Sequence, residues 1–322
     1  MNPLQKIKQY FTIPSVTVLI PAFQSQEFIC ETLDSLDGQT FRNFQIFISI
    51  DKSNDDTELI TKRWFKENKN IRSQIFCHRN QLGMVKNVNF LIGKCRTKYF
   101  MIMPHDDILD KNYLQKMVQC LETNKKAIMA YSDIQAFGIQ SHIVIQKSTL
   151  GNRLERTLQY LNHNAGGEPF RALVNRTLLS KPIFLFENNC SDFAADTTWV
   201  IQMTMKGELI RVPEVLYHKR YHEGSLFNPW ETVRKEEKTQ AWLEHCKDCL
   251  KIIFGACFNQ EELDLLIKSI QSRLVDSLWY SEELKYNEKE RTLLLGILEK
   301  TITNLDKNKN KTGHQVSSPQ QI

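Results

Sequence analysis

The sequence predicts an α/β fold built around a parallel sheet. Short apolar runs alternate with segments whose apolar residues recur at helical spacing through the first 135 residues, which is typical of βαβ units. One of these runs, residues 99–103, leads through Pro104 and His105 into two adjacent carboxylates, Asp106 and Asp107. Because ligands bind at the carboxyl ends of strands in open α/β sheets, this position is the first candidate site.

The strands of the first half are short apolar runs, two of them stopped by proline. We expect strands at residues 16–20, 44–50, 73–77, 99–103 and 127–133. Apolar residues three or four positions apart indicate the intervening helices, which we expect near residues 28–36, 59–65, 85–92 and 111–123. The polar turn 51–57 carries Ser and Asp residues that are suited to cap the second helix.

The second half begins with a looser pattern between residues 138 and 195. Gly166-Gly167 and Asn188-Asn189 indicate loops there. A helix is expected at 197–205, followed by two strands, 209–212 and 215–221, on either side of Pro213. From Trp230 onward three apolar stripes at helical spacing predict packed helices, and the polar residues 306–322 predict a disordered tail.

Composition and charge exclude several classes of function. A net charge of +5, from 42 basic and 37 acidic residues, is too mild to indicate nucleic acid as the main partner. It suits an anionic small substrate or a weak peripheral contact with the inner face of a membrane. We find no apolar stretch of spanning length and no signal-peptide pattern, so we expect a cytoplasmic protein with reduced thiols. Neither Gly-x-Gly nor a P-loop motif occurs.

The carboxylate pair has two interpretations on residue chemistry alone. Adjacent carboxylates repel each other unless a cation lies between them, and Mg²⁺ or Mn²⁺ prefers oxygen ligands and shares them with phosphate. Alternatively, Asp106 or Asp110 caps the helix that follows. The Cys246-x-x-Cys249 pair beside His245 is interpreted as core, because no second cysteine pair with finger spacing accompanies it.

The order of motifs over residues 14–226 resembles a family 2 glycosyltransferase with a GT-A fold. The matching segments are 18–23, Glu27 with Leu33, 51–57, 80–83 with Asn87, 105–107, 196–199 and 220–225. The sequence departs from the family pattern at Pro104, where an Asp is usual. It also departs at Lys52, where an acidic residue is common, and at Lys86, where a small residue or Arg is common.

The resemblance implies a mostly parallel central sheet flanked by helices. The helices expected after residue 230 fall outside the resemblance and form a C-terminal helical extension. It implies a catalytic GT-A domain at 15–228, whose nucleotide-binding half is 15–135 and whose acceptor half is 136–228. A leader (1–14), a C-terminal helical region (229–305) and the tail (306–322) complete the expected organisation. The C-terminal helices are expected to form a homo-oligomer surface, an acceptor platform or a membrane-proximal lid.

The resemblance also implies a nucleotide-sugar donor, by family habit a UDP-sugar, with Mn²⁺ or Mg²⁺ as cofactor. Asp107 is expected to bind the metal directly, and His222 to be a further metal or phosphate contact. Arg220 is expected to pair with phosphate or with a carboxylate. The residues expected to bind the nucleotide are Pro21, Ala22, Phe23, Glu27, Asp51, Asn80, Gly83, Lys86, His105 and Asp106. Simpler readings remain open: Phe23 as core, Asp51 as a helix cap, Asn80 and Lys86 as solvated surface, and His222 as structural.

The expected reaction is a hexosyl transfer to a saccharide or lipid-linked acceptor by direct displacement, which inverts the anomeric carbon. Asp196 is expected to be the general base, since a sugar hydroxyl needs a proton acceptor at neutral pH. Two alternatives are a sugar nucleotidyltransferase and a non-catalytic nucleotide-sugar-binding protein of the same fold. The first usually has a Gly-rich, basic loop after its first strand, and residues 22–26 contain neither Gly nor a basic residue.

Overall fold

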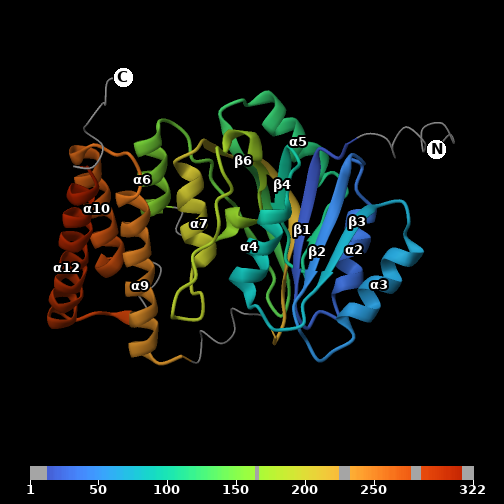
Figure 1. Cartoon of the computed structure of the whole chain (residues 1–322), viewed down its shortest axis with the longest axis horizontal. Coiled ribbons are helices and arrows are strands. Elements are labelled where there is room, and N and C mark those ends of the chain that lie inside the picture. Colours follow the sequence, from blue (N-terminus) through green and yellow to red (C-terminus); the bar gives the residue numbers. More distant parts are fainter. Residues whose placement is uncertain (1–12, 164–166, 225–232, 277–283, 314–322) are drawn as a thin grey trace, which may run out of the picture.

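The computed structural model describes residues 13–163, 167–224, 233–276 and 284–313 (Figure 1). Nearly all of the expected leader, together with Gly166, Ser225 and Trp230, lies outside this part of the chain. The described strands form one nine-stranded sheet in the order β3-β2-β1-β4-β8-β6-β9-β5, with β7 paired to β6. Helices pack on both sides of it, so the expected α/β fold is confirmed.

The first half of the chain builds the parallel part of the sheet. Its elements are β1 (Val16–Ala22), α2 (Ile29–Asp37), β2 (Phe44–Ile50), α3 (Thr57–Glu67), β3 (Arg72–Cys77), α4 (Met84–Lys94) and β4 (Tyr99–Ile102). β1 pairs in parallel with β2 and β4, and β2 pairs in parallel with β3. β1, β2 and β4 are buried almost throughout, which explains why they read as continuous apolar runs. The carboxyl ends of β1, β2 and β4 therefore meet at one edge of the sheet.

The second half adds a mixed part to the same sheet. Its elements are β5 (Ile108–Leu109), α5 (Tyr113–Thr123), β6 (Ala127–Gly138), β7 (His142–Val144), α6 (Arg153–His163), η1 (Glu168–Arg171), β8 (Leu173–Asn175), η2 (Arg176–Leu178), α7 (Ala195–Thr204) and β9 (Glu208–Tyr221). The long pairing, between β6 and β9, is parallel, whereas the antiparallel pairings cover only two or three residues each. The sheet is thus mostly parallel by length of pairing.

Two sequence expectations in this half need correction. The strands expected at 209–212 and 215–221 form one strand, β9, because Pro213 and Glu214 fall where the register with β6 slips between Val212 and Val215. A proline lacks the N–H that a regular ladder needs, and a bulge accommodates it without breaking the strand. β6 also extends five residues beyond the expected end, to Gly138.

The C-terminal helices are α9 (Lys235–Phe254), α10 (Gln260–Asp276) and α12 (Glu288–Gly313). Figure 1 shows them side by side at the end of the molecule opposite β3. They pack on α6 and α7, and one hydrophobic cluster runs from Leu19 in the sheet through Trp199 to Leu298. α7 is buried on nearly all sides between the sheet and α9, which fixes the helix that carries Asp196.

α12 continues to Gly313, so residues 306–313 are helical where disorder was expected. The lysines of this segment are good helix formers, and Leu305 packs against the core one turn earlier. Cys246 and Cys249 are fully buried in α9, with the Sγ of Cys249 3.6 Å from Nε2 of His245, in agreement with a core role. No described helix is long and apolar enough to cross a membrane.

Candidate functional site

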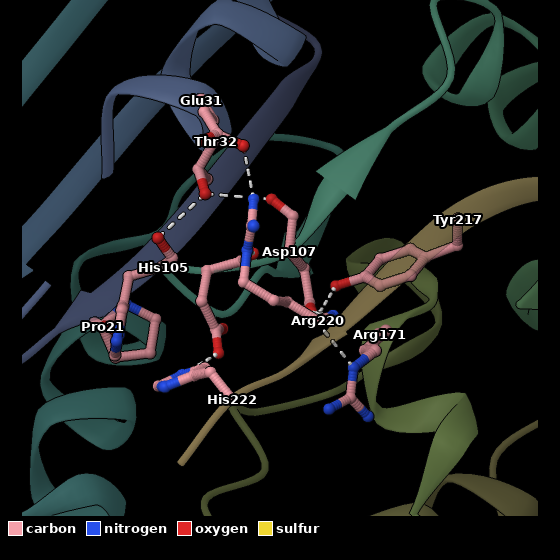
Figure 2. Close-up of polar contacts among 10 residues, drawn as sticks. Pro21, Glu31, Thr32, His105, Asp107, Arg171, Tyr217, Arg220 and His222 are labelled. Atoms are coloured by element: carbon pink, nitrogen blue, oxygen red, sulfur yellow. Dashed lines mark hydrogen bonds and ion pairs between the residues drawn. The ribbon is translucent and has the colours of Figure 1, made fainter. Parts of the chain in front are cut away.

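The turn from His105 to Asp107 follows β4 and is held by the two elements beside it (Figure 2). The hydroxyl of Thr32, in α2, lies 2.8 Å from the carbonyl oxygen of His105 and 2.9 Å from that of Asp107. Nδ1 of His105 lies 3.1 Å from the carbonyl oxygen of Pro21, at the end of β1. The turn is therefore anchored at both the strand and the helix before any ligand binds.

Asp107 is enclosed by protein donors. Its side chain is buried, with 1% of the residue exposed. One oxygen accepts from the hydroxyl of Tyr217 at 2.7 Å and from Nε of Arg171 at 3.1 Å, and the other accepts from the backbone N–H of Arg220 at 2.9 Å. Burial raises the pKa of Asp107, while the guanidinium of Arg171 opposes the rise. The direct metal contact expected of Asp107 stays a prediction, and protein donors already use three of the about four acceptor positions of this carboxylate.

Asp106 points to a different partner. Its Oδ2 lies 3.1 Å from Nε2 of His222, at the end of β9, and both side chains are partly exposed. Two neighbouring ligands of an octahedral Mg²⁺, each about 2.1 Å from the ion, lie about 3 Å apart. The Asp106–His222 separation is close to that edge and is also the length of the hydrogen bond that joins the two side chains. Oxygen and imidazole ligands suit Mg²⁺ or Mn²⁺. Within the described residues no group of three or more His, Cys, Asp or Glu side chains is gathered for a metal ion, so Asp106 and His222 offer two ligand atoms of suitable type.

Arg220 contacts the backbone of Asp106 and the carboxylate of Glu31. Its Nε donates to the carbonyl oxygen of Asp106 at 3.0 Å, and its terminal nitrogen pairs with the carboxylate of Glu31. The guanidinium lies 5.0 Å from the ring centroid of Phe28 and 4.5 Å from that of Phe137. Figure 2 shows the side chain directed towards Glu31 and Thr32, with His222 on the opposite side. Of the two expected partners, phosphate and carboxylate, the structure shows the carboxylate.

Asp51, at the end of β2, organises the loop before α4. Its oxygens accept from the backbone N–H groups of Leu82 at 2.7 Å, Gly83 at 2.9 Å and Lys52 at 2.8 Å. Gly83 has a φ of +83°, which favours glycine. Asp51 does not cap the next helix, because Asp55 accepts from the N–H and the hydroxyl of Thr57 instead. Asp51 therefore holds the loop at residues 82–83 against the polar turn 51–57 at this edge of the sheet.

The other residues expected to bind the nucleotide surround this edge at different depths. Ala22 accepts from the N–H of Asp51 through its carbonyl oxygen at 2.8 Å, so the ends of β1 and β2 are joined there. Phe23 is half-buried, whereas Glu27 and Asn80 are exposed. Lys86 is also exposed and forms an ion pair with Glu187 at 3.3 Å. Their contacts with a nucleotide stay predictions.

Asp196 lies in the first turn of α7, where its Oδ1 accepts from the N–H of Thr197 at 2.7 Å. Gly167 approaches the carboxylate so closely that a Cβ there would lie 1.8 Å from Oδ2. Burial alone would lower the pKa of Arg171, but the charge of Asp107 raises it instead, with a further contribution from Asp196. Arg171 therefore links the buried end of the carboxylate pair electrostatically to the expected base.

Sequence reasoning did not identify Arg171, Tyr217 or Thr32 as site residues. Arg171 falls in the loosely patterned region, Tyr217 reads as a strand aromatic, and Thr32 lies within a helical stripe. Arg171 is 64 residues from Asp107 and Tyr217 is 110 residues from it, so no local spacing could have indicated the contacts.

Comparison with known proteins identifies the family of the chain. A family model described as Glycosyl transferase family 2 matches residues 17–181. A glycosyltransferase of Haemophilus influenzae without an assigned activity is 26% identical over 222 residues, which cover 65% of this chain and 66% of that protein. The Escherichia coli protein WfaP, a UDP-Glc:α-D-GlcNAc-diphosphoundecaprenol β-1,3-glucosyltransferase, is 28% identical over 120 residues, or 37% of this chain and 45% of that protein. The chain spans less than two thirds of the length of either relative.

Among solved structures, residues 1–349 of Staphylococcus aureus TarS in complex with UDP-GlcNAc superpose with a TM-score of 0.66 at 16% identity. The match covers 89% of this chain and 81% of that one. At this identity the likeness shows the fold alone, which is the GT-A arrangement of a mixed sheet flanked by helices.

Proposed function

Because the chain belongs to glycosyltransferase family 2, we propose that it transfers a sugar from a UDP-sugar to the hydroxyl of a saccharide or lipid-linked acceptor. The observation that carries this proposal is the pairing of Asp106 with His222 at the sheet edge, with Arg171 linking that turn to Asp196. Family membership decides against a sugar nucleotidyltransferase. The UDP donor is favoured by the name of the E. coli relative and by the nucleotide in the TarS complex.

Asp106 and His222 are the residues that would hold a divalent cation. A bound Mg²⁺ or Mn²⁺ supplies Lewis-acid stabilisation to the diphosphate as it leaves. This assignment moves the metal contact from Asp107, which was expected to make it, to Asp106. Asp107, with Arg171 and Tyr217, then acts as the buried support that keeps the turn in place.

Asp196 would take the proton of the acceptor hydroxyl as the new bond to the anomeric carbon forms. The carboxylate is partly exposed at a helix start and fixed by α7, so it is accessible without being loose. A single displacement by the acceptor oxygen breaks the bond to the UDP oxygen and inverts the configuration. No enzyme nucleophile is needed, and the proton ends on Asp196.

The acceptor class rests on relatives and on the site's surroundings. The E. coli relative is named for an acceptor that carries a diphosphate and an undecaprenyl chain. We extend that chemistry to this chain as the lipid-linked alternative, with a soluble saccharide as the other.

The test is Asp196→Asn, which keeps the size and the N–H contact but removes the base. Release of UDP in the presence of acceptor should fall by about 10²–10⁴-fold. Calorimetric binding of UDP with Mn²⁺ should stay near wild type, because Asp196 makes no contact with the Asp106–His222 pair in the structure. Near-normal transfer would move the base elsewhere, first to Asp192. Absence of UDP binding by the wild-type protein would refute the donor site.

A further inference from the structure

The hairpin formed by the end of β6 and by β7 exposes an unusual set of apolar side chains. Ile139, Ile143 and Ile145 are 59%, 56% and 69% exposed. Ile143 lies in β7, and Ile145 lies two positions later, directly after the end of that strand. No Asp or Glu occurs between residues 134 and 150. An exposed apolar cluster of this kind indicates a contact surface rather than ordinary scattered apolar residues.

The edge position of β7 strengthens this reading. Within the described residues β7 pairs with β6 alone. Proteins usually protect such an edge with charged side chains, a proline or a covering element, because an apolar edge promotes aggregation. β7 itself has the sequence His-Ile-Val and carries no Lys, Asp, Glu or Pro. A surface that keeps this liability is expected to be covered in the working protein.

The hairpin lies directly beside the candidate active site. The backbone N–H of Ile139 donates to the carbonyl oxygen of Tyr221 at 3.0 Å, and Tyr221 immediately precedes His222. The ring of His142 lies 6.1 Å from that of Tyr221. The exposed isoleucines therefore belong to a segment that is hydrogen-bonded to the residue next to His222.

The charges around the isoleucines select among partners. Lys147 and His142 are exposed on the hairpin. Across β6, His218 and Lys219 of β9 are in register with Gln135 and Ala136, which pair with Ile143 and His142 on the other side. A second copy docked edge to edge along β7 would bring the exposed His142 and Lys147 of the two hairpins near one another. An anionic lipid surface complements them, and interfacial binding grows with buried apolar area and with cationic charge.

We propose that the β6–β7 hairpin inserts its isoleucines into the headgroup region of an anionic bilayer and holds the active site at the membrane surface. The inference deepens the proposed function, on which it rests, by favouring a lipid-linked acceptor over a soluble saccharide. It assigns Ile139, Ile143 and Ile145 to the apolar contact and Lys147 to the headgroups.

The experiment is co-sedimentation of the full chain with vesicles of phosphatidylcholine alone or with phosphatidylglycerol. The test variant is Ile143→Asp with Ile145→Asp. The matched control is Leu59→Asp with Leu293→Asp, since these residues are 56% and 65% exposed on α3 and α12. Wild type and control should bind the phosphatidylglycerol vesicles. The test variant should bind at least tenfold more weakly, and salt should weaken the wild-type binding.

Equal vesicle binding by test variant and control would overturn the proposal, as would no binding by the wild type. Analytical ultracentrifugation of the same proteins tests whether a second copy binds the hairpin instead. A dimer formed by the wild type and the control but not by the test variant would assign the hairpin to a contact between two copies. Calorimetric measurement of UDP binding by each sample distinguishes failure of the proposed function from failure of the membrane contact. Vesicle binding without UDP binding refutes the proposed function, whereas UDP binding without vesicle binding refutes only the membrane contact.

Discussion

The exchange of Asp106 and Asp107 for asparagine tests the site assignment most directly. The two residues are adjacent and have the same side chain, yet the structure gives them opposite environments. Asp107→Asn leaves the guanidinium of Arg171 without its buried partner. It also places an amide NH₂ against donors, either Arg171 and Tyr217 on one side or the backbone N–H of Arg220 on the other. Asp106→Asn affects only a partly exposed contact with His222.

The expected magnitudes differ accordingly. Breaking a buried ion pair by removing one partner costs about 3–5 kcal/mol, whereas a partly exposed pair contributes about 1 kcal/mol or less. For a chain of this size 1 kcal/mol shifts Tm by roughly 2–4 °C. Asp107→Asn should therefore lower Tm by roughly 6–20 °C, and Asp106→Asn by about 4 °C at most.

The assay is thermal unfolding with and without UDP and Mn²⁺. A ligand at about 100 times its Kd stabilises a protein by about 2.7 kcal/mol. In Asp107→Asn the metal-dependent rise in Tm should persist, counted from the lowered Tm of the variant without ligand. In Asp106→Asn this rise should disappear. The opposite pattern, a stable Asp107→Asn that no longer binds and an Asp106→Asn that binds normally, would refute the reasoning and restore Asp107 as the metal ligand.

Two further substitutions test a close contact of Asp196 and an ion pair between β6 and β9. Gly167→Ala is compatible with the backbone φ of −79°, but its Cβ would lie 1.8 Å from Oδ2 of Asp196 and would turn the carboxylate. Transfer measured by UDP release should therefore fall by roughly 10²-fold with little change in Tm. Unchanged transfer would show that the carboxylate adapts. Burial alone would raise the pKa of Asp133, but hydrogen bonds from Arg211 outweigh the burial and lower the pKa. The ion pair therefore stabilises the fold fully at pH values above the ordinary pKa of 3.8, and this stabilisation is lost as the pH falls through the lowered pKa. Urea unfolding should show wild type more stable than Asp133→Asn by roughly 1.5–3 kcal/mol at neutral pH, with a gap that narrows on acidification; a gap that widens would contradict the pairing.

Local patterns in the sequence were sufficient for the framework of the fold. The alternation of apolar runs and helical stripes predicted the parallel strands β1 to β4 and the helices between them, because burial on both faces of a strand requires a continuous apolar run. The order of motifs predicted the family, and the match to residues 17–181 confirmed it. The extent of α12 was wrong, since composition alone does not show that Leu305 packs against the core.

The chemistry of the carboxylate pair was decided only by the tertiary structure. The sequence determined that Asp106 and Asp107 follow a buried strand, and both had the chemistry of a metal ligand. Which one faces outward depends on β9, whose Tyr217 and Arg220 donate hydrogen bonds to Asp107, and on His222, which directly follows that strand and contacts Asp106. It also depends on Arg171 from the 3₁₀ turn η1. These contacts join residues 64 to 116 positions apart, so the direction of each carboxylate is set by the register of distant elements rather than by its neighbours in sequence.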